Sequence, residues 1–336
     1  MRKTIDVTII AIVRNNWRQV ENCLKSLLRQ PGVTTEIILL DDGSDDGAGK
    51  EIKGFAQRNT GIKLFEQKYK GLANSRNKAL RQIQGRYTLF VNQDQELLPY
   101  ALQLAFNEAA RHNADVVQMP YMVRDAKRPR QQRLRRMPAL HEPMGGGEYV
   151  KTFGGKMRIE TGNHANMVKS DYLKERLVRF DHRLKDYDFD FFARAIVGAE
   201  TVVVSPCPVF VTPKDRVVET APGEDPVKTF SLEQEYLRRN FNEFADSSYL
   251  TPERVRLLRY LRCLHVLDSD PALVRQGFAP RDYNKWVKET RGYLFDFGGW
   301  RSLRRIRQRM GLKPVAVPPE KPKTPKKQND ADKTDA

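Results

Sequence analysis

Two continuous apolar runs, separated by a helical pattern, constrain the fold of this chain most strongly. Residues 7–13 (VTIIAIV) and 36–40 (EIILL) are rich in β-branched and aliphatic side chains, as expected for strands that are covered on both faces. Residues 17–29 between them place apolar side chains at helical spacing. Further strand patterns follow at 62–65 and 86–91. Strands that alternate with helices predict an α/β fold with a mostly parallel sheet and helices on both faces.

Polar and acidic residues follow two of these predicted strands directly. The sequence DDGSDD occupies 41–46, and NQDQE occupies 92–96. Open α/β sheets bind ligands just beyond the carboxyl ends of their strands. We therefore look for the chemistry of the protein at this edge of the sheet.

The later part of the chain divides by composition. Late strands are predicted at 201–204 and 209–211, and helical periodicity begins near 228, with Thr251 before Pro252 as a helix start. The last residues are rich in Pro, Lys and Asp, which is typical of disorder. We predict an α/β domain at 1–215, a helical C-terminal extension at 216–312, and a disordered tail at 313–336.

Charge and hydropathy limit the possible partners. The 336 residues contain 59 Lys and Arg against 42 Asp and Glu, a net charge of +17, so a polyanionic partner is expected. No run approaches the roughly 20 apolar residues of a membrane-spanning helix, and no secretory signal is recognised. Three separated cysteines predict neither a disulfide framework nor a zinc site. We expect a cytoplasmic protein with reduced thiols.

Four sequence segments, taken together, resemble glycosyltransferase family 2. They are the strand ending at Asn15-Asn16, the DDGSDD segment at 41–46, GLANSRNKAL at 71–80, and GRYTLFVNQDQELLP at 85–99. A weaker similarity continues through 180–192. The resemblance implies the GT-A fold, which is Rossmann-like, and covers about two thirds of the chain.

This resemblance also implies a reaction. A sugar would pass, with inversion, from a nucleoside-diphosphate donor, expected to be UDP-linked, to an acceptor. The acceptor would be a cell-envelope glycan or a lipid-linked glycan at the cytosolic face of the membrane. A divalent metal, Mn²⁺ or Mg²⁺, would neutralise charge on the departing diphosphate.

Donor-site residues follow from the same resemblance. Asp42 would accept from the imide N–H of the base, with Asp41 in support; the alternative is a polar turn with an Asx-type hydrogen bond. Arg76 and Asn77 would help to hold strand ends or donor phosphates; a solvent-facing helix arginine is the alternative for Arg76.

The resemblance also places a metal ligand. Asp94 stands where the metal-binding DxD motif of the family ends, and it is the expected ligand. The first acid of that motif is Asn92 here, which brings no charge and is kept as a donor-site residue.

Aligning Phe180 and Phe191 with the family makes Asp188 the general base that takes the acceptor proton. Tyr187 then stands where the family has a Glu. Asp186 and Asp190 are alternative candidates for the general base, since an alignment shifted by one or two residues would place either of them at this position. A set of helix N-terminal acids favoured by the helix dipole is the structural alternative.

Further residues are candidates for the donor or acceptor site because of their position in the sequence. Lys214 and Arg216 fit the loop that closes over the diphosphate in the family. His164 lies in a segment expected to line the acceptor cleft.

Two basic segments supply most of the net charge, since residues 124–136 and 299–312 together carry eleven of the seventeen net positive charges. The second segment has an apolar stripe opened by Trp300, as in a peripheral membrane anchor, or it docks on the protein. The first is either a loop for a phosphorylated acceptor or a solvated charge run. Nucleic-acid binding is disfavoured because no stacking or groove-reading module is visible.

A rival hypothesis is a catalytically silent GT-A protein that only binds a glycan or a partner protein. Asn92 and Tyr187, two departures at acidic positions of the family, support it.

Overall fold

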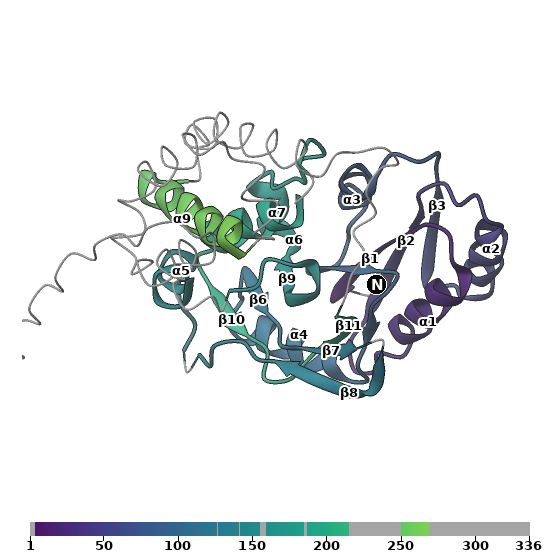
Figure 1. Ribbon diagram of the computed structural model, residues 1–336, viewed down its shortest axis with the longest axis horizontal. Coiled ribbons are helices and arrows are strands. Elements are labelled where there is room, and N and C mark those ends of the chain that lie inside the picture. The colour runs from purple at the N-terminus through teal and green to yellow at the C-terminus, as the bar shows by residue number, and fades with distance from the viewer. Residues whose placement is uncertain are drawn as a thin grey trace, which may run out of the picture.

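A seven-stranded sheet forms the centre of the computed structural model, which describes residues 4–125, 127–140, 142–154, 159–184, 187–214 and 250–268. Its strand order is β10-β6-β9-β4-β1-β2-β3 (Figure 1). Every neighbouring pair is parallel except those of β9, which runs antiparallel between β4 and β6. The predicted α/β fold with a mostly parallel sheet is confirmed. The bounds are β1 (Val7–Val13), β2 (Thr35–Asp41), β3 (Ile62–Glu66), β4 (Tyr87–Asn92), β6 (Val116–Gln118), β9 (Asn166–Lys169) and β10 (Val202–Val204).

The central strands are buried on both faces, and their side chains alternate between two apolar cores. Ile10 and Ile38 lie in the first core, whereas Ile9, Ile37 and Leu89 lie in the second. This alternation follows from the two-residue period of a strand. It explains why β1 and β2 read as continuous apolar runs in the sequence.

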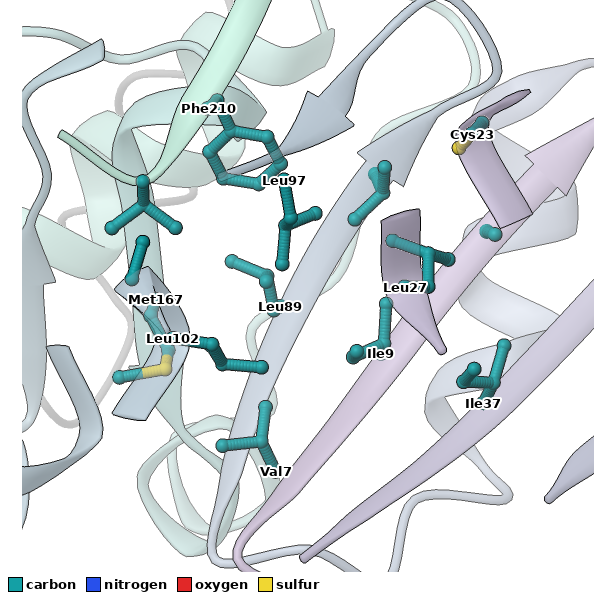
Figure 2. Packing of buried hydrophobic residues seen from close by; sticks show 14 of the residues in the cluster. Val7, Ile9, Cys23, Leu27, Ile37, Leu89, Leu97, Leu102, Met167 and Phe210 are labelled. Carbon is teal, nitrogen blue, oxygen red and sulfur yellow. The ribbon is translucent and has the colours of Figure 1, made fainter. Parts of the chain in front are cut away.

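Helices cover both faces of the sheet. The second core packs against α1 (Trp17–Leu27), α2 (Ala48–Arg58) and α4 (Ala101–Arg111), and Figure 2 shows Leu27 of α1 and Leu102 of α4 within it. The first core is closed by five helices. These are α3 (Leu72–Leu80), α5 (Gly146–Phe153), α6 (Ser170–Glu175), α7 (Tyr187–Gly198) and α9 (Pro252–Asp268).

A second, four-stranded sheet in the order β5-β11-β7-β8 lies on the side of the second core. Its strands are β5 (Glu96–Leu97), β11 (Phe210–Pro213), β7 (Tyr121–Asp125) and β8 (Arg128–Arg135). The predicted late strands are present, but β10 belongs to the large sheet and β11 to the small one. The basic segment 124–136, considered above as a loop, is mostly strand, since it contains the end of β7 and all of β8.

The described part of the predicted C-terminal extension is one helix. In α9, Thr251 caps the start as expected, with its hydroxyl accepting from the Arg254 N–H at 3.3 Å. Leu257, Leu258 and Tyr260 are buried in the first core beside α5 and α7. This helix therefore shares a core with the α/β domain. The predicted anchor at 299–312 and the tail at 313–336 lie outside the described residues.

No helix within the described ranges is long and apolar enough to cross a membrane.

A buried carboxylate holds the amino-terminal edge of the sheet. Glu36, which is 4% exposed, accepts hydrogen bonds from Thr8 Oγ1 at 2.5 Å, Lys63 Nζ at 2.6 Å and the Gln84 N–H at 2.7 Å. Burial alone would raise the pKa of Glu36, but these hydrogen bonds outweigh it and lower the pKa below its ordinary value. One side chain thus links β1, β2, β3 and the turn before β4.

We expect Glu36→Gln to lower the free energy of unfolding by about 1–3 kcal/mol at neutral pH, because buried donors lose their charged partner. Urea denaturation measures this change. Since the pKa of Glu36 is lower in the folded protein, its contribution is present above the unfolded pKa and is lost as pH falls through the folded value. The difference between wild type and variant should therefore narrow in acid. Glu51→Gln, at an exposed position of α2, is the control; equal effects of the two variants would contradict the prediction.

Candidate functional site

Three loops meet at the carboxyl edge of the large sheet, because β2, β1 and β4 are neighbouring parallel strands. The Arg14 N–H donates to Gln93 Oε1 at 2.7 Å, which joins the loop after β1 to the loop after β4. The Asn15 N–H donates to Ser44 Oγ at 2.9 Å, which joins it to the loop after β2. The loops that follow these strands are thus joined by hydrogen bonds at one edge of the sheet.

The turn after β1 is held by the acids of the DDGSDD segment. Asn15 and Asn16 have φ values of 58° and 53°, in the left-handed region. The Asn15 amide and Asp45 exchange two hydrogen bonds of 2.8 Å, and the Asn16 N–H donates to Asp46 Oδ2 at 2.7 Å. The bond from Asn15 lowers the pKa of Asp45, and bonds from backbone N–H groups lower the pKa of Asp46. Both carboxylates are therefore charged when they hold the turn at neutral pH.

Asp41, a predicted donor-site residue, accepts from the Ser44 N–H at 3.0 Å and from Ser44 Oγ at 2.7 Å. These bonds form the Asx-type turn that we considered as the alternative to a donor role.

Asp42, which is 2% exposed, holds the loop between β3 and α3. Its carboxylate accepts from the Lys70 and Gly71 N–H groups at 2.9 Å and from Gln67 Nε2 at 2.8 Å. An ionised carboxylate has about four acceptor positions, so these three hydrogen bonds leave one acceptor position of Asp42 unused.

Arg76 of α3 is not a surface residue, since it is 1% exposed. Its guanidinium forms an ion pair with Asp188 of α7 and donates to Asn92 Oδ1 at 2.7 Å. The rings of Phe180, Tyr187 and Phe90 surround the cation at 5.1, 5.5 and 5.8 Å from their centroids. Arg76 therefore joins the end of β4 to the start of α7 inside an aromatic shell.

Asn92 lies in a buried amide network. While its Oδ1 accepts from Arg76, its Nδ2 donates to Asn163 Oδ1 at 3.0 Å. Asn163 in turn donates to the Phe90 carbonyl at 3.1 Å and to Gln95 Oε1 at 3.0 Å. An amide can accept and donate at once, whereas an ionised carboxylate only accepts. The network thus gives a physical reason for asparagine at this position.

The acids of α7 point to different partners. Asp188 is 16% exposed in its side chain and pairs with Arg76. Asp190, at 7%, pairs with Arg194 one turn along the helix at 2.6 Å. Asp188 and Asp190 therefore belong to two separate ion pairs. Asp186 lies outside the described residues.

Asp94 borders a polar cavity of about 230 Å³. The cavity lies between the start of α1, the turn from β4 to β5, and Arg124 of β7. Glu96 also lines it and pairs with Arg124 at 2.9 Å. The lining residues are Asn16, Arg18, Gln19, Asn22, Gln93, Asp94, Glu96 and Arg124.

The donor atoms around Asp94 decide what kind of metal site is possible. Among the residues that the structure describes, no three His, Cys, Asp or Glu side chains gather as a metal-binding group. Asn92 is committed to Arg76 and Asn163. One carboxylate suffices for Mg²⁺ or Mn²⁺ when substrate phosphates and water complete the coordination. Asp94 therefore fits a cation that is shared with a bound diphosphate.

The remaining candidates lie around this edge or beyond the described ranges. Lys214, half exposed after β11, pairs with Asp125 at 3.4 Å. His164 packs edge-on against Tyr121, with ring centroids 4.3 Å apart. Asn77 exchanges two hydrogen bonds with the backbone of Phe180, at 2.7 and 2.9 Å. Arg216 lies outside the described residues.

Sequence reasoning missed Asn163 and Gln95, which complete the network around Asn92. Asn163 adjoins His164 in a segment expected to line the acceptor cleft, so its place in the sequence could have identified it as a site residue. Gln95 stood within the strand-end run NQDQE. No spacing rule pairs these amides, because 71 residues separate Asn92 from Asn163.

Comparisons with known proteins bear on the family and the fold of this chain. The model of the family described as glycosyl transferase family 2 matches residues 8–175, half of the chain. The cholesterol galactosyltransferase of Borreliella burgdorferi is 33% identical over 111 residues, 33% of this chain and 31% of that protein. The uncharacterized glycosyltransferase EpsJ of Bacillus subtilis is 33% identical over 111 residues, 33% and 32% of the two chains. The matched segments thus span about a third of these curated relatives.

Solved structures share the fold. Residues 1–349 of TarS from S. aureus, in complex with UDP-GlcNAc, superpose with a TM-score of 0.64 at 18% identity, covering 89% of this chain and 83% of that one. The mannosyltransferase PcManGT from Pyrobaculum calidifontis, in complex with GDP-Man and Mn²⁺, gives a TM-score of 0.53 at 17% identity, covering 93% and 84%. These likenesses support the GT-A fold.

We expect Arg76→Met to lower the free energy of unfolding by about 3–5 kcal/mol, because it leaves Asp188 without its cation and Asn92 without its donor. Urea denaturation followed by circular dichroism measures the change. Arg81→Met is the matched control, since Arg81 is exposed at the C-terminal cap of the same helix. A loss at Arg76 no greater than that at Arg81 would show that the buried ion pair is not needed for stability.

Proposed function

We propose that this chain, which belongs to glycosyltransferase family 2, transfers a sugar from a nucleoside-diphosphate donor to an acceptor hydroxyl. One observation carries the proposal: Arg76 brings Asp188, which lies 112 residues further along the chain, to Asn92 at the end of β4. The acid assigned as base thus lies at the carboxyl edge that also holds Asp42 and Asp94. Such an edge is where open α/β sheets bind their ligands.

The donor we propose is a UDP-sugar. Asp42 has an acceptor position left for the imide N–H of a uracil base, and Asp41 fixes the turn beside it. Two proteins of similar fold have been solved with nucleotide sugars, one with UDP-GlcNAc and one with GDP-Man. Lys214 and Arg216 follow β11, and we assign them to the loop that contacts the diphosphate.

The reaction is a direct displacement with inversion. Asp188 Oδ1 is engaged by Arg76, so we assign proton removal to Oδ2. The acceptor oxygen forms a bond to the anomeric carbon as its proton passes to this carboxylate. The bond from the anomeric carbon to the diphosphate breaks, and the nucleoside diphosphate leaves. We prefer Asp188 to Asp190 because Arg194 holds Asp190 in a separate buried pair.

We assign Asp94 to a divalent cation, Mn²⁺ or Mg²⁺, that arrives with the donor. When bound, such a cation neutralises charge on the diphosphate. Asn92 does not add charge to this position; it fixes Arg76, and through Arg76 it fixes Asp188.

The acceptor we propose is a cell-envelope glycan, free or lipid-linked, at the cytosolic side of a membrane. The charge of the chain supports this, because residues 124–136 carry seven positive charges and one negative charge. Peripheral contact with an anionic membrane is assigned to the basic segment 299–312. Nucleic acid is not among the partners that we propose.

A catalytically silent GT-A protein remains the second candidate. Asn92 and Tyr187 replace two acids of the family pattern, and the acid that follows Tyr187, Asp188, is held by a buried cation. Such a protein would bind donor or glycan without turnover.

Thermal unfolding in the presence of UDP, GDP, UDP-GlcNAc and GDP-mannose, each with and without Mn²⁺, tests the donor and the metal together. We expect stabilisation by uridine nucleotides that increases with Mn²⁺. In Asp94→Asn the metal-dependent part should vanish, because the carboxylate ligand is lost. Stabilisation by every nucleotide, unchanged by metal or by Asp94→Asn, would contradict both assignments.

Release of UDP from a UDP-sugar, with and without glycan acceptors, tests the chemistry. Asp188→Asn should lower the rate at least about 100-fold, as expected for loss of a general base, while nucleotide binding is kept. Asp171→Asn, at an exposed acid of α6, is the control. Wild-type protein that binds the assayed UDP-sugar and releases no UDP from it, with or without acceptor, would favour the silent alternative.

A further inference from the structure

An exposed aromatic residue lies beside the carboxylate assigned to the base. Tyr69, between β3 and α3, is 60% exposed. Its neighbours Lys70 and Gly71 donate their N–H groups to Asp42 at 2.9 Å. A large aromatic side chain usually gains free energy by burial. An exposed ring on a loop tied to a functional carboxylate is therefore a candidate ligand surface.

The backbone under this ring is fixed in two further ways. The Gln67 N–H donates to the Asp41 carbonyl at 3.1 Å, which continues the pairing of β2 with β3. Gly43 has a φ of 81°, and a Cβ at this glycine would lie 2.7 Å from the Tyr69 nitrogen. The loops after β2 and β3 thus touch through their backbones, and only glycine permits the contact. These contacts hold the backbone of Tyr69 in place.

The side chain of Arg14 packs against the ring of Tyr69. The Arg14 guanidinium lies 4.4 Å from the centroid of the Tyr69 ring, within the distance of a cation–π contact. Arg14 is itself held by Asp45 at 3.1 Å and by the Gly43 carbonyl at 3.4 Å. One face of the ring is therefore ordered by protein, while the side chain as a whole remains mostly open to solvent.

The position of Tyr69 along the sheet suggests which part of a ligand it meets. Tyr69 follows β3, whereas Arg76 bridges Asp188 to Asn92 at the end of β4, and β3 and β4 are separated by β2 and β1. Three inter-strand spacings are about 14 Å, comparable with an extended nucleotide sugar. If the reacting carbon lies by Asp188, the opposite end of the donor, its base, lies by Asp42 and Tyr69.

We propose that Tyr69, supported by Arg14, is the surface on which the nucleobase of the donor stacks. This inference rests on the proposed function. Stacking on an aromatic ring stabilises any base, because every base has a π face. Asp42 would then read the hydrogen-bonding edge, and Tyr69 would supply affinity without selecting among bases.

Isothermal titration of the full chain with UDP and with pyrophosphate, which lacks the base, tests the inference. Tyr69→Ala should weaken UDP binding about tenfold or more, in line with the loss of one stacked base. Tyr69→Phe, which keeps the ring, should bind UDP within about twofold of wild type. Pyrophosphate binding should be unchanged in both variants.

Tyr100→Ala is the matched control, since Tyr100 is also 60% exposed but lies before α4. Thermal unfolding without ligand shows whether Tyr69→Ala retains its fold; if it does not, Tyr69→Leu replaces it. Equal UDP affinities for the Tyr69 and Tyr100 variants would overturn the inference and leave the proposed function intact. Wild-type protein that binds no nucleotide would overturn both.

Discussion

A buried guanidinium is the constraint on which the rest of this site depends. Arg76 carries a full charge at a position that is 1% exposed, and removing such a charge from water costs several kcal/mol unless partners surround it. Asp188, Asn92 and the rings of Phe180 and Tyr187 supply those partners from β4, α7 and the segment before it. These elements must come together for the cation to be tolerated, so the same interaction that satisfies Arg76 also assembles the site.

The acids at the strand ends form two groups: some hold turns of the chain by hydrogen bonds, and others border a cavity. Asp41, Asp45 and Asp46 bind turns of the chain itself, and their oxygens are used in hydrogen bonds to Ser44, Asn15 and Asn16. Asp94 and Glu96 border a cavity instead. Most acids of the DDGSDD segment therefore form hydrogen bonds within the chain, which leaves few of them to bind a ligand. Much of the charge of this segment fixes the loops on which the few ligand-facing groups stand.

The sequence was sufficient for the fold and for the grouping of polar strand ends at one edge of the sheet, because both follow from local patterns. Apolar runs identify β1 and β2, and acids directly follow strands. It was insufficient for the partners of each side chain. Arg76 was weighed as a surface arginine, and nothing within α3 indicates that Asp188 and Phe180 enclose it. Asn92 was expected as a donor-site residue, whereas its amide hydrogen-bonds to Arg76 and Asn163 at once. Such roles depend on contacts between residues far apart in the chain.

The left-handed turn at Asn15 and Asn16 bears on the order in which the protein assembles. Each residue adopts a conformation that costs of order 1 kcal/mol outside glycine. The carboxylates that compensate them, Asp45 and Asp46, lie 30 residues away. The bonds from Asp45 and Asp46 can form only when the loops after β1 and β2 lie side by side, as the pairing of these strands places them. The shape of this turn thus belongs to the assembled sheet, since an N-terminal peptide that ends before Asp45 would lack both of these contacts.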